Sequence, residues 1–331
     1  MRPLPGRGLY AAVVLLAAGA AGAAGAAGGG NAGVAANGKI DALWEQFAGR
    51  VADIEHRLDG VLGVAVLDLS SGKQFLLRPD EIFPQASSIK ITVLAELYRQ
   101  SEIASSAAPG SGAGGARLAD SYLVQTSDIV QDSDIMAGLT PGITRLTNRD
   151  LATMMVAVSD NAATNVLIDR VGMDRVNSML RDQGLSHTQL RRKMMDLGAA
   201  KAGRENVSTP REMMQLLEKL YRGELLRKSS TDDFFTMLAT HKDSWLPLHL
   251  PETLRIANKP GALEGVRADS GVVFLERRPY VICVMTTFLS DERAGEAVIG
   301  DISAAAYLMF ERISRASEYG RVISPSNGSS R

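Results

Sequence analysis

The spacing of apolar residues divides the chain into helices and strands. Residues 39–58 carry an apolar side chain at every third or fourth position, which predicts a helix with one buried face. Residues 63–78 alternate apolar and polar side chains around a Ser-Ser-Gly triplet, a pattern typical of a β-hairpin. By the same criteria we expect further helices at 87–100, 147–158, 161–171, 210–222 and 291–315, and further strands at 253–260, 267–276 and 280–288.

Two of these helices have recognisable first residues. Thr147 stands three residues before Asp150, which is the spacing of a capping box. Thr209 precedes Pro210, and proline is favoured at the first position of a helix. Two connections are long: residues 184–208 are polar and irregular, which indicates an Ω-type loop, and the Gly/Ala/Ser-rich residues 104–116 indicate a flexible surface loop.

Strands are expected near both ends of the chain, with helices between them. This order predicts an α+β fold in which one antiparallel sheet is built from N- and C-terminal strands and is flanked by helices. The central helices would form a second, all-helical lobe. We expect one folded domain over residues 39–316 and a flexible tail over residues 317–331.

The first 30 residues have the layout of a secretory signal peptide. Arg2 and Arg7 precede an apolar run that passes into Ala- and Gly-rich sequence with A-x-A triplets. The alternative is a transmembrane anchor, but the strongly apolar part, Leu9–Ala18, is short for a hydrocarbon core. We therefore expect a periplasmic or secreted protein with no stable membrane anchor after cleavage.

Composition excludes several classes of function. With 36 Lys plus Arg against 37 Asp plus Glu, the net charge of −1 gives no reason to expect a nucleic-acid partner. Cys283 is the only cysteine, and the four histidines show no metal-ligand spacing. We expect neither a metal nor another cofactor, and a monomer is the default state.

The first candidate for chemistry is Ser87-Ser88-Ile89-Lys90, at the start of an expected helix. Residues three apart on a helix share a face, so the Lys90 amine can lie beside the Ser87 hydroxyl. A lysine whose pKa is lowered can accept the serine proton and so create a nucleophile. The alternative is an N-cap serine followed by an exposed lysine.

Two further motifs contain polar groups of the kind that assist acyl transfer. In Ser159-Asp160-Asn161 the serine could relay a proton and the amide could hold a carbonyl, although a turn and helix cap are the simpler interpretation. In Lys259-Pro260-Gly261 the lysine could bind a carboxylate, and Gly261 would let a ligand approach the strand edge. The alternative there is a turn that ends the strand.

In this order the three motifs resemble the signature of class A β-lactamases and penicillin-binding proteins. The likeness to the class A β-lactamase family extends from about residue 39 to residue 316, and it includes Thr209-Pro210 and Asp269. The resemblance implies a β-lactamase/transpeptidase-like fold and a serine hydrolase that opens β-lactams or related peptidoglycan peptides through an acyl-serine intermediate.

The resemblance also implies roles for the matching residues. Ser87 would be the acylated nucleophile and Lys90 its general base or proton relay. Ser159 would pass a proton to the departing nitrogen, Asn161 would contact the substrate amide, and Lys259 would bind the substrate carboxylate or activate Ser159.

Further substrate contacts are expected on and beside the third motif. The backbone N–H groups of Ser87 and Ala262 would form the oxyanion hole, next to Gly261. Arg267 is a second possible carboxylate partner, although an exposed strand arginine is the simpler interpretation.

Two departures from the family pattern bear on turnover. In LRRKMMDL (190–197), Met194 falls where the family has the glutamate that activates the deacylating water, and a thioether accepts no proton. Asp196 and Glu205 are near in sequence, but we expect them to point elsewhere. Pro260 replaces a Thr or Ser, which removes one hydroxyl donor and requires an edge that no further strand pairs with.

Three interpretations remain open. The chain could be a β-lactamase-like hydrolase with slow deacylation, and a cell-wall D,D-peptidase is a variant of this enzyme. It could instead be a module that binds β-lactams or peptidoglycan peptides without turnover, which Met194 and Pro260 favour. It could also be a structural relic, since a fold can outlive its chemistry.

Overall fold

Strands from the two ends of the chain pair with each other in one antiparallel sheet of five strands, in the order β2-β1-β9-β8-β7. The computed structural model of the protein describes residues 30–106, 115–317 and 319–321. The strands are β1 (Val61–Asp68), β2 (Gln74–Leu77), β7 (Ile256–Leu263), β8 (Val266–Val273) and β9 (Tyr280–Thr287). The β1–β9 pairing joins residues more than 200 positions apart, and it confirms the predicted α+β sheet.

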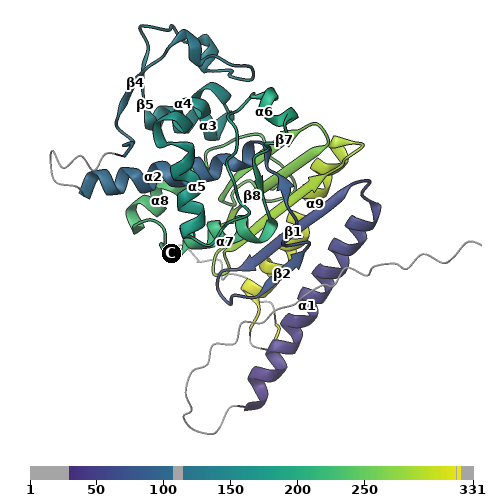
Figure 1. Cartoon of the computed structure of the whole chain (residues 1–331). Helices are drawn as coiled ribbons and strands as arrows, with labels where there is room; N and C mark the ends of the chain where they lie inside the picture. Colours follow the sequence, from purple (N-terminus) through teal and green to yellow (C-terminus); the bar gives the residue numbers. More distant parts are fainter. Residues whose placement is uncertain (1–29, 107–114, 318, 322–331) are drawn as a thin grey trace, which may run out of the picture.

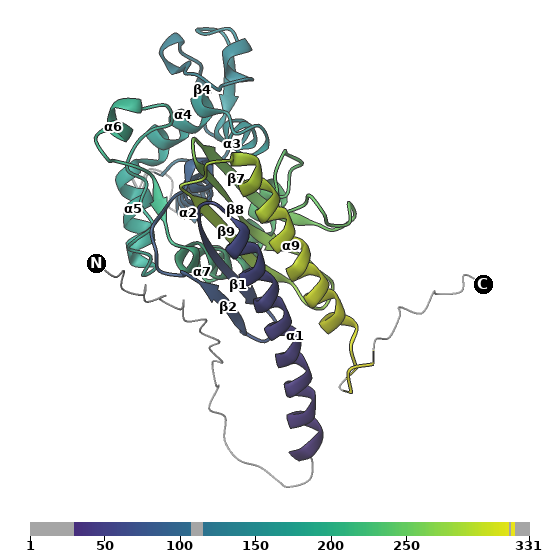
Figure 2. The same cartoon turned by 90° about the vertical axis from the view of Figure 1, so that its right-hand side faces the viewer.

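Each face of the sheet is covered by helices, because alternate strand residues are apolar on both sides. In β1, Val64 and Val66 face a cluster with the two terminal helices, whereas Ala65 and Leu67 face the helical lobe. The terminal helices are α1 (Gly30–Arg57) and α9 (Glu292–Arg315). Figures 1 and 2 show them side by side along one face, with the helical lobe beyond the other.

The helical lobe lies between β2 and β7 in the sequence. It contains α2 (Lys90–Ser106), α3 (Asn148–Ala157), α4 (Asn161–Val171), α5 (Met173–Asp182), α6 (Leu197–Lys201), α7 (Pro210–Tyr221) and α8 (Lys228–Leu238). Two short antiparallel pairs, β3 (Phe83–Pro84) with β6 (Val207–Ser208) and β4 (Ser121–Leu123) with β5 (Arg145–Thr147), join its loops. Three single-turn 3₁₀ helices complete it: η1 (Ala86–Ile89), η2 (Thr126–Asp128) and η3 (Met136–Gly138).

The capping residues define the helix starts as the sequence predicts. Thr147 and Asp150 form a reciprocal capping box at α3, and Thr209 accepts a hydrogen bond from the Glu212 N–H at α7. The final helix begins one residue after its cap, Asp291. These local signals are reliable because they satisfy N–H groups that have no partner within the helix.

Several elements differ from the prediction. The helices α5 and α8 are not expected from the sequence, and α2 continues to Ser106 instead of ending at residue 100. The first helix already begins at Gly30, the segment 87–100 opens with the turn η1, and the loop 184–208 contains α6 and β6. The strand expected at 253–260 is β7 (Ile256–Leu263), so Lys259-Pro260-Gly261 lies inside a strand rather than at its end. Pairing with β8 continues through all three residues, because β7 is an edge strand and Pro260 needs no second partner.

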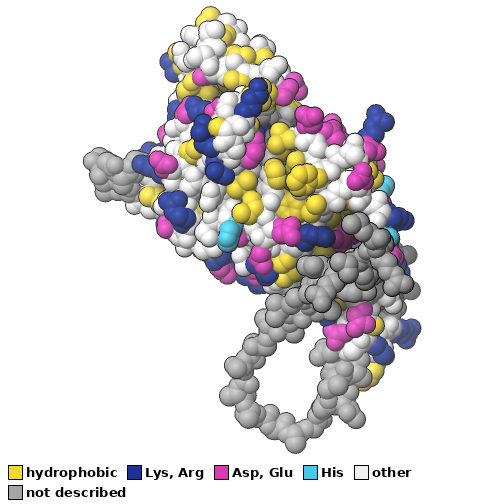
Figure 3. Space-filling model, turned by 45° about the vertical axis from the view of Figure 1, so that its right-hand side comes forward, with side chains coloured by type: hydrophobic (Ala, Val, Ile, Leu, Met, Phe, Trp, Pro, Cys, Tyr) yellow, Lys and Arg dark blue, Asp and Glu magenta, His cyan; other side chains and the backbone are white. Residues whose placement is uncertain are grey.

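Some predictions fall on parts of the chain outside the described residues. These are the signal peptide up to residue 29, the centre of the loop 104–116 and most of the tail 317–331. Among the described residues, no helix combines the length and apolar character needed to cross a membrane. On the face shown in Figure 3, acidic and basic side chains are interspersed, as the net charge of −1 suggests.

Candidate active site

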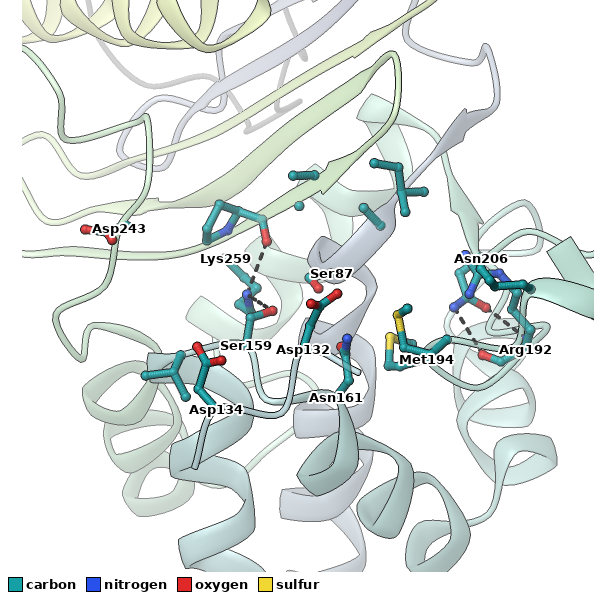
Figure 4. A pocket seen from close by; sticks show the side chains of 18 of the residues that line it. Ser87, Asp132, Asp134, Ser159, Asn161, Arg192, Met194, Asn206, Asp243 and Lys259 are labelled. Atoms are coloured by element: carbon teal, nitrogen blue, oxygen red, sulfur yellow. Dashed lines mark hydrogen bonds between the residues drawn. The ribbon is translucent and has the colours of Figure 1, made fainter. Parts of the chain in front are cut away.

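A cleft of about 520 Å³ opens between β7 and the helical lobe, and it is lined by residues from all three candidate motifs. Ser87, Ser159 and Lys259 line it together, although they are as far as 172 positions apart in sequence (Figure 4). The fold thus assembles the predicted set in one place. Asn161, Gly261 and Ala262 also line this cleft.

The first motif places its two reactive groups on different elements. Ser87 lies half-buried in η1, and Lys90 is the first residue of α2, with a side chain 1% exposed. The Lys90 ammonium donates to Ser159 O (2.6 Å), Ser159 Oγ (3.0 Å) and Asn161 Oδ1 (2.9 Å). All three of its protons are directed at the second motif, and no hydrogen bond joins it to Ser87 among the described residues.

The second motif is both a helix cap and part of the site. Ser159 has a positive φ of 58°, which turns the chain sharply before α4. The buried Asp160 carboxylate caps α4 through the Ala163 N–H and also accepts from the N–H groups of Ile135 and Met136. The cap that the sequence left as the simpler interpretation is therefore present, and it aims Ser159 and Asn161 at Lys90.

The third motif brings a second buried lysine to the same serine. Lys259, 1% exposed, donates to Ser159 Oγ (3.0 Å) and to Pro260 O (3.2 Å). Two residues on, Gly261 lies against η1 so closely that an added Cβ would be 2.4 Å from Gln85 O and 2.7 Å from Ser88 N. Only glycine allows this approach, which fixes Ser87 relative to β7.

Burial perturbs the proton affinity of both lysines. It lowers the pKa of Lys90 well below the ordinary value, and the positive charge of Lys259 lowers it further. Burial likewise lowers the pKa of Lys259 to about 7. The Lys259 amine can therefore exchange protons near neutral pH, and clusters of perturbed groups occur preferentially at functional sites.

Arg267 is not part of the cleft. It is 8% exposed and forms ion pairs with Glu292 (2.7 Å) and Glu296 (2.9 Å) of α9. Neither alternative for this residue is right, since the side chain is neither a cleft residue nor an exposed strand arginine. It fastens β8 to the helix on the opposite face from the helical lobe.

Met194 lines the cleft where the family resemblance predicts a glutamate. It is buried, and Asn165 of α4 binds its backbone on both sides, with Asn165 Nδ2 donating to Met194 O (3.1 Å) and Met194 N donating to Asn165 Oδ1 (2.8 Å). The two carboxylates near in sequence are engaged elsewhere: Asp196 caps α6, and Glu205 pairs with Arg192.

Sequence reasoning missed several residues that build the site. Asn165, which clamps the Met194 loop, is not among the expected residues. Asp269 is expected only as part of the family likeness; burial raises its pKa to about 6, and it accepts from the N–H groups of Trp245 and Leu246. The cleft residues Asp132, Asp134 and Asp243 also went unnoticed. Asn165 follows Ser159-Asp160-Asn161 by one helical turn, which is a usable signal, whereas Asp132, Asp134 and Asp243 lie in irregular segments.

Among the described residues, no three His, Cys, Asp or Glu side chains are grouped so that they could hold a metal ion. The motif residues bring hydroxyl, amine and amide groups to the cleft. A serine beside two perturbed lysines, a second serine and an amide is suited to acyl transfer.

Comparison with known proteins points in the same direction. A model of the β-lactamase enzyme family matches residues 46–310. β-Lactamase CTX-M-8 of Citrobacter amalonaticus is 28% identical over 265 residues, which cover 78% of this chain and 87% of that protein. The β-lactamase of Streptomyces albus G is 27% identical over 289 residues, covering 80% of this chain and 86% of that protein.

Solved structures share the fold. The β-lactamase from Sphaerobacter thermophilus superposes with a TM-score of 0.71 at 30% identity, covering 81% of this chain and 98% of that one. PBP-A superposes with a TM-score of 0.69 at 24% identity, covering 80% of this chain and 96% of that one. The second likeness concerns the fold alone.

The close approach at Gly261 gives a first prediction. Gly261→Ala forces β7 away from η1 and should lower the free energy of unfolding by about 1–3 kcal/mol, as overpacking does. Gly49→Ala is the matched control: an added Cβ there meets nothing within 4 Å, and the helix α1 should gain about 0.5–1 kcal/mol. Urea unfolding of both variants tests this, and equal effects would contradict the packing argument.

Proposed function

The chain belongs to the β-lactamase enzyme family, and on this premise we propose that it is a serine hydrolase that opens the amide bond of a β-lactam ring through an acyl-serine intermediate. One observation carries the proposal. The Ser159 hydroxyl accepts hydrogen bonds from both Lys90 and Lys259, at the cleft that Ser87 lines. A protein that only binds its ligand needs no pair of buried lysines around a hydroxyl.

Acylation uses the site as follows. The lowered pKa of Lys90 lets its ammonium give up one proton, and Ser87 Oγ then attacks the lactam carbonyl while the neutral Lys90 amine accepts the Ser87 proton. The carbonyl oxygen becomes an oxyanion bound by the N–H groups of Ser87 and Ala262. The C–N bond of the ring then breaks, and Ser159 donates a proton to the nitrogen. In the structure Lys90 is bonded to Ser159 and Asn161, so its amine must turn from Ser159 O toward Ser87 before it can accept the proton. Such a change is ordinary, because hydrogen bonds between catalytic groups often form fully only when substrate is bound.

Substrate placement falls to the remaining residues. Asn161 would contact the amide of the substrate side chain, and Lys259 would bind the substrate carboxylate and, through its hydrogen bond, hold Ser159 in position. Gly261 keeps the edge of β7 open to an extended substrate. The steps proposed here use only groups of the protein and the substrate, and no cofactor.

Deacylation should be slow. Hydrolysis of the acyl-serine requires a base that takes a proton from water, and the thioether of Met194 cannot do this. Asp196 and Glu205 are already engaged in a helix cap and an ion pair. Because loss of a general base typically costs about 10²–10⁴-fold, the ester should persist.

Met194, in the place of a deacylating base, favours a second candidate function. A penicillin-binding D,D-peptidase, or a protein that binds β-lactams or peptidoglycan peptides without turnover, requires no base at the position of Met194. The two candidates differ in the fate of the acyl group, which a D,D-peptidase transfers or releases only from its own peptide substrate.

We also propose the setting in which the protein works. Residues 1–30 would act as a cleaved signal peptide and residues 39–316 as the hydrolase domain, followed by the tail 317–331. The mature protein would be periplasmic or secreted, monomeric and without a stable membrane anchor.

The nucleophile is tested by mass spectrometry after mixing with a penicillin. The protein should gain the full mass of the penicillin, because ring opening releases no fragment, and the adduct should map to Ser87. Ser87→Ala should show no adduct. Ser88→Ala is the matched control, since the buried Ser88 hydroxyl has no hydrogen-bond partner, and it should be labelled as the wild type is. Labelling of Ser87→Ala would refute the assignment.

The missing base predicts a gain of activity. Met194→Glu should speed the decay of the acyl-enzyme by about 10²–10⁴-fold, because it restores a carboxylate beside the ester. Met194→Gln adds polarity without a base and should leave the decay slow. Time-resolved mass spectrometry measures both rates. Rapid return of the wild type to its free mass would contradict the proposed slow step.

The protonation of Lys259 predicts a pH dependence. Its lowered pKa of about 7 means that the ammonium predominates below pH 7 and is lost above it, so the rate of acylation by a penicillin should fall as the pH rises through 7. Lys259→Arg keeps its charge and should lose this decline, at a lower overall rate. An unchanged decline in Lys259→Arg would assign it to another group.

A further inference from the structure

Three carboxylates line the cleft without a hydrogen bond or an ion pair to another described residue, although the charge of Asp132 acts on Lys90. Asp132, Asp134 and Asp243 are exposed lining residues, and none forms a hydrogen bond or an ion pair through its side chain with another described residue. Figure 4 shows Asp134 and Asp243 on the side of Ser159 and Lys259, across the cleft from Met194 and Arg192. This side is where the substrate group beyond the reacting bond would lie.

Two separately anchored segments carry these carboxylates. The N–H groups of Ile135 and Met136, next to Asp134, donate to buried Asp160. The N–H groups of Trp245 and Leu246, close to Asp243, donate to buried Asp269. Both backbones are therefore held at the rim, and the carboxylates cannot withdraw from the cleft with their segments.

Positive charge on the same side is scarce. Lys259 and Arg192 are the only basic residues that line the cleft in the described part of the chain, and Arg192 is paired with Glu205. Arg267 is bound to α9, and Pro260 contributes no hydroxyl donor. Lys90 and Lys242 lie near Lys259, but their ammonium groups are bonded to protein oxygens and neither residue lines the cleft. A substrate with a carboxylate alone therefore meets one cleft-lining lysine without an acidic partner and several like charges, which is unfavourable.

From this charge arrangement we infer that the cleft selects substrates that carry a cationic group, an ammonium, beside the carboxylate bound by Lys259. The ammonium would lie between Asp134 and Asp243, which provide its counter-charges. The inference rests on the proposed function and specifies the substrate class of the same site: zwitterionic β-lactams or amides rather than purely anionic ones.

The test compares two cephalosporins that share ring and acyl side chain and differ at the C3 substituent, which is neutral in one and a quaternary ammonium in the other. The quantity measured is the second-order rate constant for acylation of Ser87 at low ionic strength. The ammonium compound should react about three- to tenfold faster, the range expected for two exposed ion pairs, and added salt should reduce the ratio.

Variants locate the preference. The two compounds also differ in intrinsic reactivity, which is measured by their rates of hydrolysis in hydroxide. In the double variant Asp134→Asn/Asp243→Asn, the ratio of the two acylation rate constants should approach the ratio of these hydrolysis rates. The double variant Glu45→Gln/Glu81→Gln is the matched control, because it removes the same charge from exposed positions outside the cleft. It should keep the wild-type ratio.

The possible failures are distinguishable. If both compounds acylate Ser87 and the corrected ratio is one or less, or if the two double variants change it equally, the charge inference is wrong and the proposed function stands. If neither compound labels Ser87, the proposed function is wrong and the inference falls with it.

Discussion

The buried ammonium of Lys90 is the interaction on which the rest of the site depends. A charge removed from water is costly unless it is fully hydrogen-bonded, and Ser159 and Asn161 supply all three acceptors. These bonds join the segment that carries Ser87 and Lys90 to the turn before α4. Lys259 binds the same Ser159 hydroxyl from the sheet, so three distant segments meet at one oxygen. The low proton affinity of both lysines follows from this burial.

The opposite wall of the cleft is equally ordered but chemically different. Asn165 holds the backbone of Met194 by two hydrogen bonds, so the loop presents a thioether to the cleft in a fixed place. The loop is thus held in place by Asn165, with Met194 at the position where the family resemblance implies a carboxylate. In the function proposed above, acylation and deacylation would depend on opposite walls, and only the wall of Ser87 and Lys90 would carry the groups that its step needs.

Local signals in the sequence predicted most of the fold. Caps such as Thr147 and Thr209 act within one helical turn, and the apolar alternation that placed β1 and β9 acts within a strand. What the sequence could not show is set by packing at long range. The contact of Gly261 with η1 cannot be read from the local sequence, which instead suggested that Lys259-Pro260-Gly261 ends its strand. The ion-pair partners of Arg267 lie on α9, some 25 residues further along the chain. The cleft carboxylates lie on irregular segments and have no periodicity to reveal them.

A crystal structure of the protein after soaking with a penicillin tests the central claim most directly. The account predicts electron density continuous with Ser87 Oγ, an ester carbonyl oxygen between the backbone nitrogens of Ser87 and Ala262, and Met194 against the ester. An intact ring bound in the cleft, or an adduct on any other residue, would contradict it.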